Sequence, residues 1–136
     1  MIRRILAAVM VLALVSVTAG AADENPIVTL VKSKVKDPTK PFAMAIVFKV
    51  KPSDAKAFEA AFPPALAATR KEPGCVAYVL HRDPEAEGTF VMYEQFRSIA
   101  ALEAHAKQPY VEKLLGTVLP LLEGKPDVKV YTVAGE

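Results

Sequence analysis

The chain has 136 residues, of which 52% are hydrophobic and 24% are charged, so it can form one domain with a real core. Its single cysteine, Cys75, excludes a disulfide framework, and such a lone thiol is more often a small buried hydrophobe than a nucleophile. The net charge of +2 falls to zero once Arg3 and Arg4 are removed with the segment described next, which leaves no electrostatic basis for binding nucleic acid.

Residues 1–21 have the pattern of a secretory signal peptide. Arg3 and Arg4 precede an apolar run over 5–17, and small residues ending in Ala21 follow it. The run is short for a membrane span, although an uncleaved N-terminal anchor is the alternative. The sequence therefore predicts cleavage after Ala21, or after Ala22, and an exported protein, periplasmic or secreted, with no stable membrane insertion once the signal is removed.

Residues 22–41 are predicted to be an N-terminal extension. The apolar run 27–31 indicates a short edge strand, and the alternating lysines that follow it, Lys32, Lys34 and Lys36, are typical of edges that discourage further pairing. A basic arm for an anionic surface is the alternative interpretation of the same lysines. Pro38 and Pro41 separate this extension from the domain.

Residues 42–134 are predicted to form one domain with the element order β-α-β-β-α-β. Ser53 and Ser98 are the expected helix N-caps, and Pro63 and Pro64 are expected to kink the first helix. Pro109 is expected to end the second helix, which carries His105. The predicted strands are 42–51, 75–82, 89–96 and 128–133, and the predicted helices are 53–71, 98–108 and a short extra helix over 110–122.

This order is that of a ferredoxin-like, split βαβ fold of the α+β class with an antiparallel sheet. Two helices cover only one face of such a sheet. The strands are nevertheless apolar on both faces: in the first strand, Met44 and Ile46 alternate with Ala45 and Val47. The simplest cover for the second face is another copy of the same sheet, so we expect a twofold homodimer.

Motifs for bound cofactors are missing from the sequence. The two histidines, His81 and His105, and Cys75 have no metal-ligand spacing, and the chain has neither a glycine-rich phosphate loop nor a dinucleotide fingerprint. A Ser-His-Asp set has no local signature either. We therefore expect neither a metal nor a cofactor, and an apolar pocket between sheet and helices with few polar groups.

Two of the candidate polar groups carry ionisable side chains suited to acid–base work. Glu94 shares a strand face with Phe90 and Met92, where a carboxylate must be paired, hydrogen-bonded or protonated. It is either a pocket acid or base with a raised pKa, or a structural residue that forms an ion pair with Arg97 or a hydrogen bond to the backbone. His105, on the flank of the apolar helix stripe, is either a general base or a packed histidine that donates to a carbonyl.

Four aromatic residues are candidate substrate contacts: Tyr78, Tyr93, Phe96 and Tyr110. The alternative for the tyrosines is a core position with a satisfied hydroxyl.

One ordered set of short motifs resembles the antibiotic biosynthesis monooxygenase (ABM) domain, which includes quinol monooxygenases. The matching residues are Glu72-Pro73-Gly74-Cys75, Tyr78, the run Phe90–Phe96, Ser98, Ala101-Leu102 and Ala104-His105, and the similarity extends over residues 42–133. The resemblance implies a dimeric α+β barrel and a cofactor-independent monooxygenase. It also implies that His105 is the base, with Tyr93 or Tyr110 as hydrogen-bond donors.

The sequence and the resemblance are compatible with two classes of function. The first is an exported, cofactor-independent monooxygenase or oxidase whose partners are a small quinol or phenolic aromatic compound and O₂. Such chemistry needs a dry pocket, a base and a donor for developing oxygen charge. The second is a non-catalytic dimeric module that binds a small ligand or acts in stress, because folds of this kind host many functions. Haem breakdown is a weaker third alternative, with His105 as the iron ligand.

Overall fold

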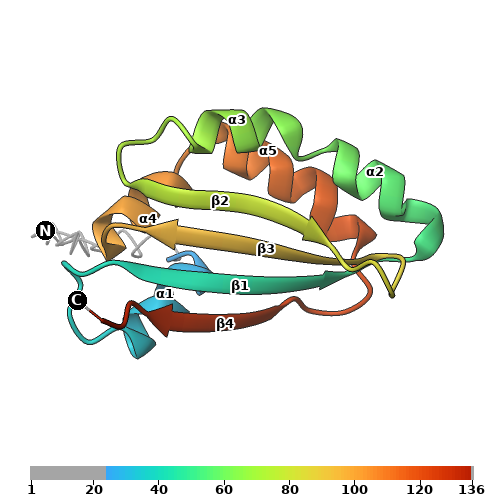
Figure 1. Ribbon diagram of the computed structural model, residues 1–136. Coiled ribbons are helices and arrows are strands. Elements are labelled where there is room, and N and C mark those ends of the chain that lie inside the picture. Colours follow the sequence, from blue (N-terminus) through green and yellow to red (C-terminus); the bar gives the residue numbers. More distant parts are fainter. Residues whose placement is uncertain (1–23, 136) are drawn as a thin grey trace, which may run out of the picture.

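The computed structural model describes residues 24–135, which form a four-stranded antiparallel sheet with helices packed on one face (Figure 1). The strands are β1 (Phe42–Lys49), β2 (Cys75–Arg82), β3 (Thr89–Phe96) and β4 (Asp127–Thr132). The helices are α1 (Pro26–Lys34), α2 (Ala55–Ala60), α3 (Pro63–Thr69), α4 (Ile99–Ala106) and α5 (Pro109–Val118), with short 3-10 turns at Pro52–Asp54 and Leu119–Leu121.

The strand order is β2-β3-β1-β4, with every neighbouring pair antiparallel. The two β-α-β units therefore interleave, and the predicted ferredoxin-like α+β fold is confirmed. Strand periodicity places Phe42, Met44 and Ile46 of β1 opposite Phe96, Glu94 and Met92 of β3, and this face forms the core.

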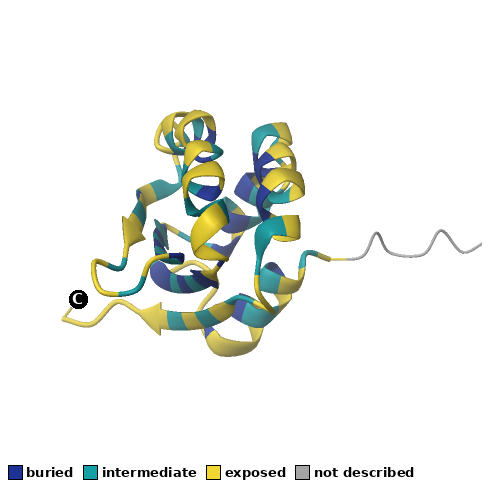
Figure 2. Ribbon diagram, turned by 90° about the vertical axis from the view of Figure 1, so that its right-hand side faces the viewer, coloured by how far each residue is buried: buried dark blue, intermediate teal, exposed yellow. Residues whose placement is uncertain are grey.

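The helices lie together on one side of the sheet (Figure 2). An aromatic group joins them to it: the Phe58 ring of α2 lies 4.8 Å from the Phe90 ring of β3 and 5.4 Å from the Phe48 ring of β1. The opposite sheet face carries the alternate residues, including Val47 and Val91, which are paired in register and only half-buried. Apolar residues are therefore present on the second face as anticipated from the sequence, beside polar ones such as Gln95 and Lys129, and in one chain nothing described covers them.

Strand β2 departs from simple alternation. A bulge between Cys75 and Ala77 leaves Val76 without a register partner, and this side chain is exposed rather than aligned with Tyr78 as the alternation predicts. After the bulge Tyr78 pairs with Glu94 and points into the core.

The prediction of an edge strand at 27–31 is wrong, because this segment forms helix α1. Asn25 caps the helix by accepting a hydrogen bond from the Ile27 N–H at 2.9 Å, and Pro26 occupies the first turn, where its missing N–H costs nothing. Val28 and Val31 lie three residues apart and are buried, which is helical spacing. The lysines at its end lie in the last turn, where they complement the helix dipole.

The first crossover is interrupted as expected at Pro63, which opens α3 after a break of two residues at the end of α2. Ser53 is not a cap, however, because Pro52 starts a 3-10 turn and α2 follows directly from it. In the second crossover Ser98 does cap α4, accepting from the Ala101 N–H at 3.2 Å. Pro109 follows α4 and opens α5.

The predicted signal peptide over 1–21 lies outside the described residues. Between residues 24 and 135, every helix is too short or too polar to cross a membrane.

Candidate active site

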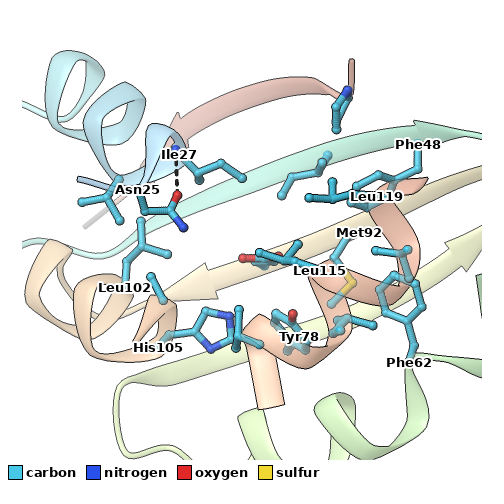
Figure 3. A pocket seen from close by; sticks show the side chains of 18 residues that line it. Asn25, Ile27, Phe48, Phe62, Tyr78, Met92, Leu102, His105, Leu115 and Leu119 are labelled. Carbon is cyan, nitrogen blue, oxygen red and sulfur yellow. Dashed lines mark hydrogen bonds between the residues drawn. The ribbon is translucent and has the colours of Figure 1, made fainter. Parts of the chain in front are cut away.

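A cavity of about 100 Å³ lies between the core face of the sheet and helices α1, α4 and α5 (Figure 3). Most of the 18 residues that line it are apolar. The four with polar side chains are Asn25, Tyr78, Glu94 and His105. Such a lining, largely apolar with a few convergent polar groups, is typical of small-molecule sites.

His105 is held by a carboxylate from a distant turn. Its Nδ1 donates to Glu72 Oε1 at 2.9 Å, and the imidazole ring packs between Tyr78 and Phe96, with ring centroids 5.2 and 5.0 Å away. The side chain is buried, not on the flank of the helix stripe as predicted from the sequence. Because the carboxylate accepts at Nδ1, the lone pair on Nε2 is left to take a proton from a ligand.

Glu72 belongs to the motif that carries the resemblance but was not among the candidate site residues, and the structure places it against His105. It lies in the turn before β2, where it also accepts a hydrogen bond from the Tyr110 hydroxyl on the same Oε1 atom. Gly74 allows this turn to approach α4, because a Cβ there would collide with the Cβ of Ala101. Burial, followed by the bond to Glu72, raises the pKa of Tyr110 to about 12, so this phenol stays neutral and donates.

Glu94 projects from β3 into the cavity and is only 7% exposed. No hydrogen bond to its carboxyl group is formed by any residue between 24 and 135, and the expected partner Arg97 instead donates to the Pro73 carbonyl at 3.2 Å. Burial, and secondarily the charge of Glu72, raises the pKa of Glu94 to about 8. Near neutral pH the carboxyl group is therefore mostly protonated and can donate a hydrogen bond to a ligand.

This shift predicts that the protein loses stability as the pH rises. In the unfolded chain Glu94 ionises at its ordinary pKa of about 4.5, and in the folded chain only at a pKa of about 8, so the stabilisation is complete at low pH and is lost between these values. Between pH 6 and pH 8 we expect a loss of about 2 kcal/mol in the free energy of unfolding.

Chemical denaturation of Glu94→Gln beside the unchanged protein at both pH values measures this contribution. The neutral amide cannot ionise, so the variant should lack this part of the pH dependence. Parallel pH curves for the two proteins would contradict the assignment.

The remaining candidate substrate contacts do not all lie on the same face of the sheet. Tyr78 lines the cavity, and burial raises its pKa, so it stays neutral. Phe96 supports the His105 ring from behind and does not line the cavity. The Tyr93 hydroxyl donates to Gln95 Oε1 at 3.3 Å on the opposite face, so Tyr93 does not belong to this site.

The other two residues singled out in the sequence lie outside the cavity. His81 is exposed, and its Nδ1 contacts the Val91 carbonyl. Burial raises the pKa of the half-buried Cys75 thiol, which keeps it in its unreactive, protonated form. The part of the chain from residue 24 to residue 135 contains no cluster of three residues that could hold a metal ion.

Comparison with known proteins gives one consistent match. The family model for antibiotic biosynthesis monooxygenase matches residues 41–115. An uncharacterized protein of Synechocystis sp. is 31% identical over 100 residues, which cover 74% of this chain and 68% of that protein.

Solved structures agree with this match. A proposed antibiotic biosynthesis monooxygenase from Caulobacter crescentus superposes with a TM-score of 0.66 at 28% identity, covering 73% of this chain and 94% of that one. The Mycobacterium tuberculosis protein Rv0793 also gives 0.66, at 29% identity, with 71% of this chain and 98% of that chain covered. The family match begins after α1, so this helix lies outside it.

Proposed function

This chain belongs to the antibiotic biosynthesis monooxygenase family, and we propose that it oxidises a small phenolic or quinol compound with O₂ without a cofactor. The observation that carries the proposal is the Glu72–His105 pair placed at an apolar cavity beside the protonated carboxyl group of Glu94. These groups provide a base, an orienting carboxylate and an acid in a site lined mostly by apolar side chains.

The first step assigned to this site is removal of the substrate's hydroxyl proton by Nε2 of His105. Glu72 fixes the imidazole with Nδ1 protonated and stabilises the imidazolium that forms, as the orienting carboxylate of a catalytic triad does. Where the ring carries further electron-donating substituents, as in a quinol, the anion that results is able to transfer an electron to O₂.

The second step is formation of a carbon–oxygen bond between the ring and reduced oxygen. Glu94 can donate a proton to the peroxide that forms, because its pKa near 8 makes it an acid at neutral pH. Loss of water then leaves a carbonyl. In total a phenol and O₂ give a quinone and H₂O: the ring loses one C–H and one O–H hydrogen and gains one oxygen, while the other oxygen is reduced to water.

The cavity volume limits the substrate. A dry cavity of about 150 Å³ accommodates a benzene molecule, and the present cavity is smaller, at about 100 Å³. A single substituted ring is therefore the substrate size that requires least movement of the surrounding helices.

Oxygen uptake by the purified protein tests this function over a panel of single-ring and fused-ring phenols and quinols, with a chelator present to suppress metal-catalysed oxidation. We expect protein-dependent uptake on at least one phenol, with a quinone product. Added catalase distinguishes a monooxygenase from a simple oxidase, because catalase returns oxygen only if the reaction releases H₂O₂. Saturable ligand binding without uptake on any compound would instead favour the non-catalytic binding module.

We also propose that the protein is exported and that its N-terminal segment is removed. The support is the sequence pattern of Arg3 and Arg4, the apolar run and the small residues through Ala21. Intact-mass measurement of protein recovered outside the cytoplasm should give a chain that begins at Ala22 or Asp23. A mass that still contains residues 1–21 would contradict cleavage.

A further inference from the structure

Helix α1 supplies a wall of the cavity that the family match, over residues 41–115, does not include. Val31 of this helix is completely buried, and Lys32 forms an ion pair with Glu103 of α4 at 2.6 Å. Asn25, Ile27 and Val28 face the cavity from the N-terminal end of the helix. The helix therefore helps to decide which ligands fit.

The side-chain amide nitrogen of Asn25 is available to bind a ligand. Its Oδ1 accepts the hydrogen bond from the Ile27 N–H, and its amide nitrogen is turned toward the cavity (Figure 3). Within residues 24–135 no acceptor is in hydrogen-bond contact with that nitrogen. The cap thus fixes the side chain with its two N–H donors facing the space that a ligand would fill.

The polar side chains of the cavity gather at one end. Tyr78 and Glu94 are register partners on neighbouring strands, and the Tyr78 ring contacts His105. Figure 3 shows Asn25 and His105 at the end where α1 meets α4, and Phe48, Phe62 and Leu119 at the other end.

The spacing of residues along β3 gives the distance from the polar end of the cavity to its apolar part. On the core face of β3 the residue next to Glu94 is Met92, about 7 Å away along the strand. That separation is roughly the length of one ring. A hydroxyl opposite the reacting oxygen would therefore lie beside Met92 and the apolar end.

We propose that Asn25 is a specificity-determining residue that selects rings with two oxygens on neighbouring carbons. One oxygen would lie at His105 and Glu94, and the other would accept from the Asn25 amide. The proposal rests on the proposed function for the identity of the reacting end. A ring with oxygens at opposite ends would bury its second hydroxyl without a partner among phenylalanine and leucine side chains, which disfavours binding.

Anaerobic isothermal titration with catechol and hydroquinone tests the proposal without turnover. These isomers have the same volume and differ only in where the second hydroxyl lies. We expect the intact protein to bind catechol at least about tenfold more tightly than hydroquinone, the difference of one buried hydrogen bond.

Asn25→Asp is the decisive variant, because aspartate caps a helix as well as asparagine but cannot donate to the ligand. The preference for catechol should fall to about threefold or less, with an unchanged melting temperature. Ser33→Ala changes an exposed side chain of the same helix, whose hydroxyl bonds to the Leu30 carbonyl, and should leave both affinities as they are. Equal binding of the isomers by the intact protein, binding of neither isomer, or a full preference retained in Asn25→Asp would overturn the assignment.

The two proposals fail separately. A catechol preference that depends on Asn25, in a protein that consumes no oxygen, would remove the catalytic function and keep the selectivity. Oxygen uptake with no preference between catechol and hydroquinone would keep the catalytic function and remove the selectivity.

Discussion

Replacing His105 by alanine should lower the rate of oxygen uptake by at least about tenfold, and by as much as the roughly 10²–10⁴-fold that a positioned base contributes. The variant removes Nε2, which we assign as the proton acceptor, and it leaves Glu72 without its imidazole partner. Because His105 is buried, the same change can also weaken packing. A second variant is needed to separate the two effects.

His105→Asn provides that separation. The asparagine amide can donate to Glu72 in place of Nδ1, but it offers no base at the position of Nε2. We expect its rate to fall as far as that of His105→Ala while its melting temperature stays closer to that of the parent. His81→Gln is the matched control, since His81 is exposed and outside the cavity. A normal rate in His105→Asn would dismiss the base assignment.

Glu72 should matter through His105 and not through contact with the substrate. In Glu72→Gln the imidazolium formed after proton transfer loses its counter-charge, so kcat should fall while KM changes little. Tyr110→Phe removes only the second hydrogen bond to the same carboxylate oxygen and should have the smaller effect. Equal effects of the two changes would indicate that the turn only supports the fold.

Strand periodicity was the most reliable guide to the site. Placing Glu94 on the same face as Phe90 and Met92 required only a period of two, and the structure buries all three. The same rule puts Tyr93 on the other face from Glu94, so the two could not share a pocket. Naming Tyr93 as a substrate contact contradicted the pattern from which its strand was predicted.

Helical residues were harder to place, since an error of one position rotates a side chain by about 100°. The expected stripe through Ile99, Leu102 and Ala106 left His105 on its edge, whereas the structure buries His105 one turn after Leu102. For α1, the five-residue apolar run fitted a strand and a helix equally well. The discriminating signal was Asn25 followed by Pro26, a cap and a first-turn proline.

Glu72 lies 33 residues from His105 in sequence, so no local spacing could pair them. Only the fold brings the turn before β2 against α4. The available hint was Gly74, whose missing side chain permits that close approach.

Placing a charge on the exposed sheet face should prevent the protein from forming a dimer. This face is the one that the helices leave open, and Val47 and Val91 lie side by side on it, on the two middle strands. We propose that a second copy covers it. In such an interface Val91→Asp would bury an unpaired carboxylate, at a cost of about 3–5 kcal/mol.

The monomer should tolerate the same change, because Val91 is only half-buried in a single chain. Light scattering should therefore show the expected dimer of the parent protein converted to a monomer with unchanged circular dichroism. Val47→Asp should repeat the result, since Val47 is the register partner of Val91. Ala57→Asp adds the same charge to an exposed position on α2, on the helical side, and should remain dimeric. If the parent protein is a well-folded monomer at micromolar concentration, the proposed dimer is contradicted. If Val91→Asp stays dimeric, the dimer interface does not include this sheet face.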